Sequence, residues 1–97
     1  MPFAIVLAPE ALEDLKRLRA TARGTVKDAM ERHLRHEPEK TSRSRIKRLR
    51  GLSRPQYRLR VGDVRLFYDA ADWVVEVLAI VPKLGTEAWL AQFGKVE

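Results

Sequence analysis

The 97-residue sequence contains no cysteine, which excludes disulfide cross-links and any reaction that depends on a thiolate. It also lacks an uninterrupted apolar run of about 18 residues, so no segment is expected to cross a membrane. The N-terminal sequence MPFAIVLAPEA has only a short apolar run with no basic residues before it. We therefore expect no secretion signal and a cytoplasmic protein.

Acidic residues are few relative to basic ones. The chain has 13 aspartate and glutamate residues against 19 lysine and arginine residues, a formal charge of +6. This surplus predicts a polyanionic partner, such as nucleic acid, an anionic membrane surface or a strongly acidic protein. The length and the absence of a linker-like tract predict one domain, residues 1–97, with one modest core.

Ligands for a metal are also scarce. The two histidines, His33 and His36, stand about one helical turn apart and could share a metal ion. No cysteine or acidic ligand has a defined spacing to them, so we expect no metal site there.

The basic residues are concentrated in one stretch, residues 43–68, which reads RSRIKRLRGLSRPQYRLRVGDVRLFY. Nine of the 19 lysine and arginine residues lie there, with Asp63 as the only acid. Two alternating runs, Tyr57–Val61 and Val64–Tyr68, flank the pair formed by Gly62 and Asp63. This pattern is typical of a β-hairpin closed by a two-residue type II′ turn.

The turn also predicts the register of the hairpin. If Val61 opposes Val64, then Arg60 opposes Arg65, and successive pairs lie on alternate faces of the sheet. The apolar face would carry Tyr57, Leu59, Val61, Val64, Leu66 and Tyr68, and the other face Arg58, Arg60, Arg65 and Phe67. Two arginines directly opposite each other destabilise a strand pair by up to about 1 kcal/mol. The arrangement indicates a site for an anion such as a phosphate backbone, although a solvated arginine-rich surface would show the same pattern.

The residues before the basic stretch predict a strand and a helical hairpin. The apolar run Phe3–Leu7 is rich in strand formers, and Pro9 suits the first turn of a helix. A second helix is expected to begin within residues 21–26, with Thr25 as its capping residue, and to end before Pro38.

The residues after the basic stretch predict one more strand and a short helix. Residues 73–81 (WVVEVLAIV) are almost all apolar, as expected for a central strand covered on both faces. Glu76 interrupts this run, and we expect it near the open face, paired with an arginine such as Arg65. A short helix should begin at Thr86. The predicted fold is a small α+β domain in which an N-terminal strand and a helical hairpin pack on a mostly antiparallel four-stranded sheet, in the order β-α-α-β-β-β-α.

This element order, with the run KRLRGLSRPQYRLRVGDVRLFYDA and the later VVEVLAIVPK, resembles the RelE/ParE superfamily of bacterial and archaeal toxins. The resemblance covers nearly the whole chain and implies a RelE-like fold and a toxin of a type II toxin–antitoxin system. Toxins of the RelE-like branch enter the ribosomal A site and cut mRNA by attack of a ribose 2′-hydroxyl on the adjacent phosphate. On this resemblance we expect a metal-independent endoribonuclease (mRNA interferase) that inhibits translation and needs no cofactor.

The resemblance also assigns roles to basic residues of this chain. Arg58 and Arg60 stand at the family's pair of basic strand residues, and Arg65 at the hairpin arginine that stabilises the transition state. Lys83 stands at or close to the basic position after the last strand. The candidate catalytic residues are therefore Arg60, Arg65 and Lys83. The candidate RNA-binding residues are Arg45, Lys47, Arg48, Arg50 and Arg58.

One position departs from the family pattern. Trp89 stands where the best-known members have a C-terminal tyrosine that acts as the base, and an indole cannot accept a proton. Either Lys83 takes over the proton transfer, or the chain is a weakly active or degenerate RNA-binding toxin homologue. A third alternative is the ParE-like branch, which shares the fold, lacks the nuclease residues and inhibits DNA gyrase.

The resemblance further implies a protein partner. Toxins of this superfamily are neutralised by an antitoxin encoded beside them, whose acidic tail wraps the toxin near its basic face or displaces its last helix. In this chain such a tail would meet Arg58, Arg60 and Arg65. The toxin–antitoxin complex is expected to bind its operator DNA through the antitoxin, and the toxin to meet mRNA on the ribosome.

Overall fold

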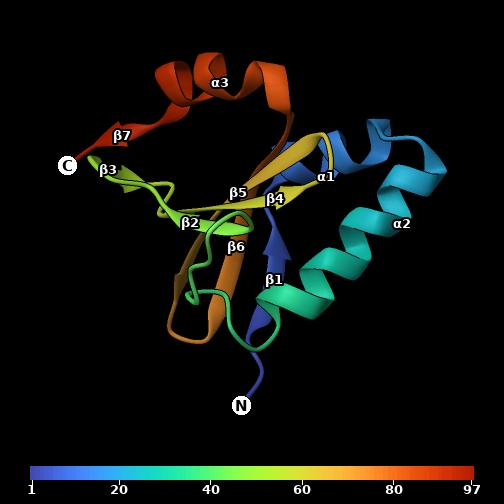
Figure 1. Cartoon of the computed structure of the whole chain (residues 1–97), viewed down its shortest axis with the longest axis horizontal. Coiled ribbons are helices and arrows are strands. Elements are labelled where there is room, and N and C mark those ends of the chain that lie inside the picture. The colour runs from blue at the N-terminus through green and yellow to red at the C-terminus, as the bar shows by residue number, and fades with distance from the viewer.

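In the computed structural model, which describes residues 1–97, the chain forms a five-stranded sheet with helices packed on it (Figure 1). The strands lie in the order β1 (Ala4–Leu7), β6 (Val74–Pro82), β5 (Val64–Ala71), β4 (Tyr57–Val61) and β2 (Ile46–Arg48). Strand β1 runs parallel to β6, and all the other neighbours are antiparallel.

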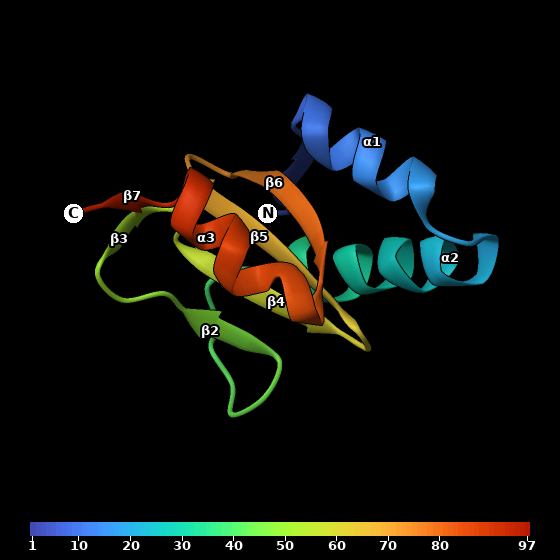
Figure 2. The same cartoon turned by 90° about the horizontal axis from the view of Figure 1, so that it is seen from above.

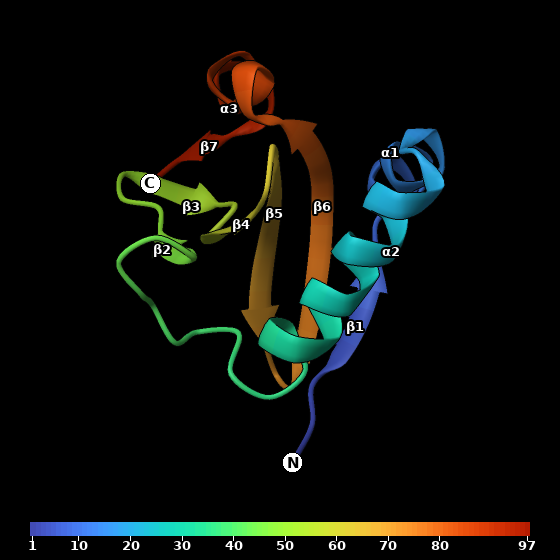
Figure 3. The same cartoon turned by 45° about the vertical axis from the view of Figure 1, so that its right-hand side comes forward.

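The helices lie on two different sides of this sheet (Figures 2 and 3). They are α1 (Pro9–Arg17), α2 (Ala20–Ala29), which continues into one π-helical turn (Met30–Leu34), and α3 (Thr86–Phe93), which follows a short 3-10 turn (Lys83–Gly85). The pair α1–α2 covers the larger core, and α3 covers a second, smaller apolar cluster on β5 and β6. None of the helices has the length and apolarity that crossing a bilayer requires.

A second, two-stranded sheet holds the C-terminal end of the chain. Strand β7 (Lys95–Val96) pairs antiparallel with β3 (Leu52–Arg54), and the Glu97 N–H donates a 3.3 Å hydrogen bond to the Gly51 carbonyl. Because β6 precedes α3 and β7 follows it, both ends of α3 are tied to strands.

The larger core lies between the α1–α2 pair and the sheet. The hairpin residues Tyr57, Leu59, Val61, Leu66 and Tyr68 are all buried there, as the alternation predicted. Burial raises the pKa of Tyr68, so its hydroxyl remains a donor, and it donates a 2.6 Å hydrogen bond to the Pro38 carbonyl. This bond ties the loop that follows the helical hairpin to the middle of the sheet.

The predicted fold class and hairpin register are confirmed. Val61 opposes Val64, and Arg60 opposes Arg65. Gly62 has a φ of +56°, as the first central residue of a type II′ turn requires. The main sheet has one strand more than expected, because the basic segment before the hairpin pairs with β4 as strand β2.

Two details of the prediction were wrong. Helix α2 already begins at Ala20, and the Thr25 hydroxyl donates to the Thr21 carbonyl inside the helix instead of capping it. Strand β6 begins at Val74, because Asp72 and Trp73 both have positive φ and form the turn between β5 and β6.

Candidate functional site

One face of the sheet carries two rows of cations, one on β2 and β4 and the other on β4 and β5. The registers place Lys47 opposite Arg58 and Arg60 opposite Arg65, and directly opposed residues share a face. The Arg60 N–H also donates to the Arg45 carbonyl at 2.8 Å, so Arg45 extends the second row. We call these five residues the cation face: Arg45, Lys47, Arg58, Arg60 and Arg65.

No carboxylate neutralises the cation face. The ion pairs of the chain involve other cations, and none includes a member of this group. Partial burial lowers the pKa of Arg58, and the charges of Arg65 and Arg60 lower it further. The buried Nε of Arg58 has no hydrogen-bond partner. The face therefore offers uncompensated positive charge to a ligand, while the unpaired Nε of Arg58 lies below the surface.

Arg65 differs from its neighbours because it is only 6% exposed. Its Nη1 donates hydrogen bonds of 2.9 Å to the Gly62 carbonyl and 3.0 Å to the Val64 carbonyl. Its guanidinium thus braces the hairpin turn, whereas Arg60, directly opposite, is exposed. Of the two facing arginines, Arg60 is the one that a ligand reaches without any rearrangement.

This difference predicts opposite effects on stability. Arg65→Ala should lower the free energy of unfolding by about 1–3 kcal/mol, because it removes a buried side chain and two hydrogen bonds to turn carbonyls. Arg60→Gln should raise it by about a few tenths of a kcal/mol, because it removes a like-charge pair. Urea denaturation of both variants would measure this. Equal losses in the two variants would contradict the bracing role of Arg65.

Lys83 lies beside the same hairpin turn. Its backbone N–H donates to the Asp63 carbonyl at 2.8 Å, and the residue is exposed at the start of the 3-10 turn that leads to α3. Arg65 and Lys83 therefore flank one turn, although they are 18 positions apart in the sequence. The structure brings together the three candidate catalytic residues, Arg60, Arg65 and Lys83, around the tip of the β4–β5 hairpin.

Trp89 packs against the same face of the sheet as the cations. Its ring stacks on Phe67 with 4.9 Å between ring centroids and 5° between ring planes, and it also contacts Phe93. Phe67 opposes Arg58 across the strand pair, so this aromatic stack borders the cation face. At this position the chain supplies apolar packing and no proton acceptor.

Two of the predicted RNA-binding residues lie away from the cation face. Arg48 opposes Tyr57 and lies over its ring at 5.3 Å, on the other side of the sheet, and its Nη1 donates to the Leu49 and Gln56 carbonyls. Arg50 is exposed in the turn between β2 and β3. The structure thus groups Arg45, Lys47 and Arg58 with the candidate catalytic arginines and leaves Arg48 and Arg50 outside.

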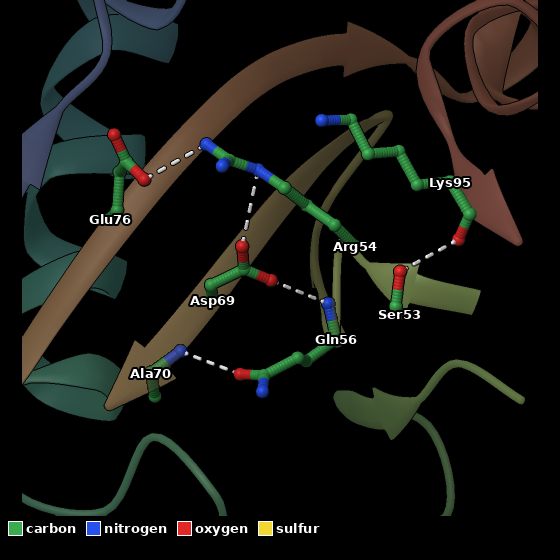
Figure 4. Close-up of polar contacts among 7 residues, drawn as sticks. All are labelled: Ser53, Arg54, Gln56, Asp69, Ala70, Glu76 and Lys95. Carbon is green, nitrogen blue, oxygen red and sulfur yellow. Dashed lines mark hydrogen bonds and ion pairs between the residues drawn. The ribbon is translucent and has the colours of Figure 1, made fainter. Parts of the chain in front are cut away.

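The sheet's own carboxylates are bound by Arg54 of β3 (Figure 4). Arg54 Nη2 lies 3.0 Å from Glu76 Oε1, and its Nε lies 3.4 Å from Asp69 Oδ2. The Gln56 N–H donates to Asp69 Oδ1 at 2.8 Å, and Gln56 Oε1 accepts from the Ala70 N–H at 2.9 Å. This network joins the small β3–β7 sheet to β5 and β6.

The predicted pairing of Glu76 with an arginine such as Arg65 was therefore wrong in its partner. The β5–β6 register places Arg65 opposite Val81 and Glu76 opposite Asp69, which keeps the acid away from the hairpin tip. Because Arg54 pairs with both carboxylates, neither can neutralise the cation face. In the whole chain, no group of three or more histidine, cysteine or carboxylate side chains comes together to hold a metal ion.

A small basic α+β domain with this strand order and helix arrangement has the fold of RelE-like toxins. Residues 5–83 match the family model described as the ParE toxin of the type II toxin–antitoxin system parDE. The match spans most of the chain, which therefore belongs to this toxin family within the RelE/ParE superfamily. No curated protein sequence matches the chain significantly.

Several solved structures share the fold. A chain of the archaeal RelE–RelB complex from Pyrococcus horikoshii OT3 has a TM-score of 0.71 and 22% identity, over 86% of this chain and 97% of that chain. A chain of the toxin–antitoxin complex RelBE2 from Mycobacterium tuberculosis has a TM-score of 0.68 and 24% identity, over 84% and 92%. A chain of the RelB–RelE antitoxin–toxin complex from Methanococcus jannaschii has a TM-score of 0.66 and 18% identity, over 87% and 96%. At these identities the likeness concerns the fold.

Proposed function

We propose that this toxin binds mRNA on the ribosome through the cation face and cuts it, which inhibits translation. The observation that carries the proposal is the two cross-strand like-charge pairs, Lys47 with Arg58 and Arg60 with Arg65, none of which forms an ion pair with a carboxylate. Such contacts destabilise the free protein and become favourable when a phosphate lies between the charges. A phosphate backbone is the ligand that best matches a two-row array of cations.

Cleavage by a ribose 2′-hydroxyl requires cations on the phosphorane-like transition state, a base for the hydroxyl and an acid for the leaving 5′-oxygen. Arg60 supplies the accessible cation, and Arg65, which holds the turn through Nη1, has further N–H donors. Lys83 carries an ammonium group beside the same turn and is the candidate acid for the leaving oxygen. Trp89 cannot accept the proton of the 2′-hydroxyl. In this mechanism a group of the ribosome or of the mRNA therefore acts as the base.

The test is induced expression in a bacterial host followed by mapping of mRNA 5′ ends. The wild type should arrest growth and produce cuts within translated codons, and Arg60→Gln should reduce the cuts by about 100-fold, because an accessible transition-state contact is lost. The matched control is Arg19→Gln, which removes one exposed charge at the start of α2, away from the cation face. Cuts that persist in Arg60→Gln at the wild-type level would refute the proposal.

The second candidate function is inhibition of DNA gyrase without nuclease activity. The match to the ParE family model and the packed Trp89 in place of a proton acceptor favour it. Under this alternative, growth arrest occurs without mRNA cuts, is insensitive to Arg60→Gln, and is accompanied by inhibition of gyrase supercoiling in vitro. RNA binding without growth arrest would instead identify a degenerate RNA-binding homologue.

An antitoxin is the expected protein partner. The three similar structures described above are complexes of toxins with RelB-type antitoxins. In this chain the uncompensated cation face suits an acidic antitoxin tail, which would occupy the site of the RNA. The pair would bind operator DNA through the antitoxin, and the toxin would act in the cytoplasm, where ribosomes are found.

A further inference from the structure

We infer that the RNA path continues beyond the cation face, around the edge strand β2, into a second basic cavity beside the C-terminal end of α2. This inference rests on the proposed function, because it extends the binding site of the same RNA strand. It adds a binding site for at least one further phosphate. The residues that would contact that phosphate are Arg32, His33 and Arg45.

Two neighbouring cavities define this path, and Arg45 lines both. The first, of about 210 Å³, is lined by Arg45, Arg60, Ser44 and Gly62 at the tip of the hairpin. The second, of about 240 Å³, is lined among others by Arg32, His33, Lys40, Thr41 and Arg45. Because one arginine belongs to both walls, a strand that leaves the first cavity past Arg45 enters the second.

The second cavity is positively charged. Its one acid, Glu37, pairs with Lys40 at 3.4 Å, so these two charges compensate each other. Arg32 and Arg45 have no carboxylate partner. Partial burial lowers the pKa of His33, and the charges of Arg45 and Arg32 lower it further. The excess charge of the cavity therefore comes from Arg32 and Arg45.

The loop that forms the wall is held in shape by its own hydrogen bonds. Ser42 Oγ accepts from the Arg45 N–H at 3.0 Å and from the Ile46 N–H at 3.1 Å, and the Ser42 N–H donates to the Ile46 carbonyl at 2.9 Å. Ile46 is buried in the core, so the loop has a fixed base. The cavity thus exists in the free protein and requires no rearrangement to admit a phosphate.

The chemistry of both cavities suits a single-stranded backbone. Grooves of unpaired cations follow the phosphates of single strands, whereas aromatic side chains in such grooves stack with the bases. Neither cavity has a phenylalanine, tyrosine or tryptophan in its lining. We therefore expect the extension to add affinity through phosphates alone, without preference for sequence.

The test uses single-stranded oligouridine with 2′-O-methyl riboses, which cannot be cleaved, in lengths of about 4 and about 8 nucleotides. A longer oligonucleotide offers more equivalent binding positions, and the affinities are first corrected for this statistical gain. After the correction, the wild type should still bind the longer oligonucleotide about tenfold more tightly than the shorter one. In Arg32→Gln this extra gain should disappear while binding of the shorter oligonucleotide is unchanged. Arg19→Gln, a matched loss of charge at the other end of α2, should retain the gain.

A second measurement locates the contact. The ring resonances of His33 should shift in NMR spectra when the longer oligonucleotide binds and stay in place with the shorter one. If Arg32→Gln retains the full length-dependent gain, or if it weakens binding of duplex RNA alone, the extension is refuted while the cation face stands. If Arg60→Gln alters binding at neither length, the proposed function fails as well. Thermal melting of each variant excludes a loss of fold as the cause.

Discussion

Replacing Arg58 and Arg60 together with glutamine is expected to weaken the binding of short single-stranded RNA by about 100-fold at low salt. Each residue supplies a charge without a carboxylate partner, and a charge-assisted contact is worth about 1.5–3 kcal/mol, or roughly tenfold or more in affinity. The slope of log affinity against log salt should fall by about 1.4, because two phosphate contacts are lost from a single strand. Fluorescence anisotropy at several salt concentrations measures both quantities.

The control for this experiment removes the same net charge elsewhere. Arg19→Gln combined with Lys27→Gln takes two exposed cations from α2, where neither forms an ion pair. This double variant should bind RNA within about threefold of the wild type, since only the long-range field changes. If both double variants lose affinity equally, binding depends on net charge and the cation face has no special role.

Phe67→Ala is expected to lower the free energy of unfolding by about 3–5 kcal/mol, the largest effect on stability among the residues around the site. Phe67 is fully buried and forms the smaller apolar cluster with Ala79 and Val81, and Trp89 of α3 stacks on its ring. The substitution leaves a cavity under α3 and removes an aromatic pair worth about 0.5–1.5 kcal/mol beyond its burial. Chemical denaturation followed by the fluorescence of Trp89 would measure the loss.

Phe93→Ala provides the comparison for that variant. Phe93 also contacts Trp89, but its side chain is 43% exposed, so its loss should cost about 1 kcal/mol. A Trp73→Phe background removes the other tryptophan signal from both measurements. If the two alanine variants are destabilised equally, Phe67 does not hold α3 on the sheet. The stack of Phe67 and Trp89 would then not fix the position of α3 beside the cation face.

The hairpin could be predicted from the sequence because its determinants are local. The pair Gly62-Asp63 sets the turn, and the alternation of apolar and basic residues on either side sets the faces. Together they predict which arginines oppose each other. The pairing of β2 with β4 adds Lys47 to the rows of cations and depends on tertiary structure. Strand β2 has only three residues, too few to show the alternation that predicts a strand.

The features that were missed depend on contacts distant in the sequence. The partner of Glu76 depends on the β5–β6 register, which shifts at a bulge between Phe67 and Tyr68. The burial of Arg65 depends on how the chain packs around the hairpin. The start of α2 carries no capping side chain, so the sequence contains no signal at Ala20. The pairing of Arg54 with two carboxylates is of the same kind, since β3 reaches β5 and β6 only in the folded chain.

The opposed cations of the cation face have a consequence for any attempt to improve this protein by selection. Substitutions that remove one partner of Arg60–Arg65 or Lys47–Arg58 relieve repulsion, and those at the exposed positions do so without loss of packing. Under the proposed function, a library sorted for heat resistance alone would therefore enrich variants that bind RNA weakly. The same library sorted for toxicity would retain these cations, so selection for thermal tolerance and selection for toxicity would favour opposite residues at the same positions.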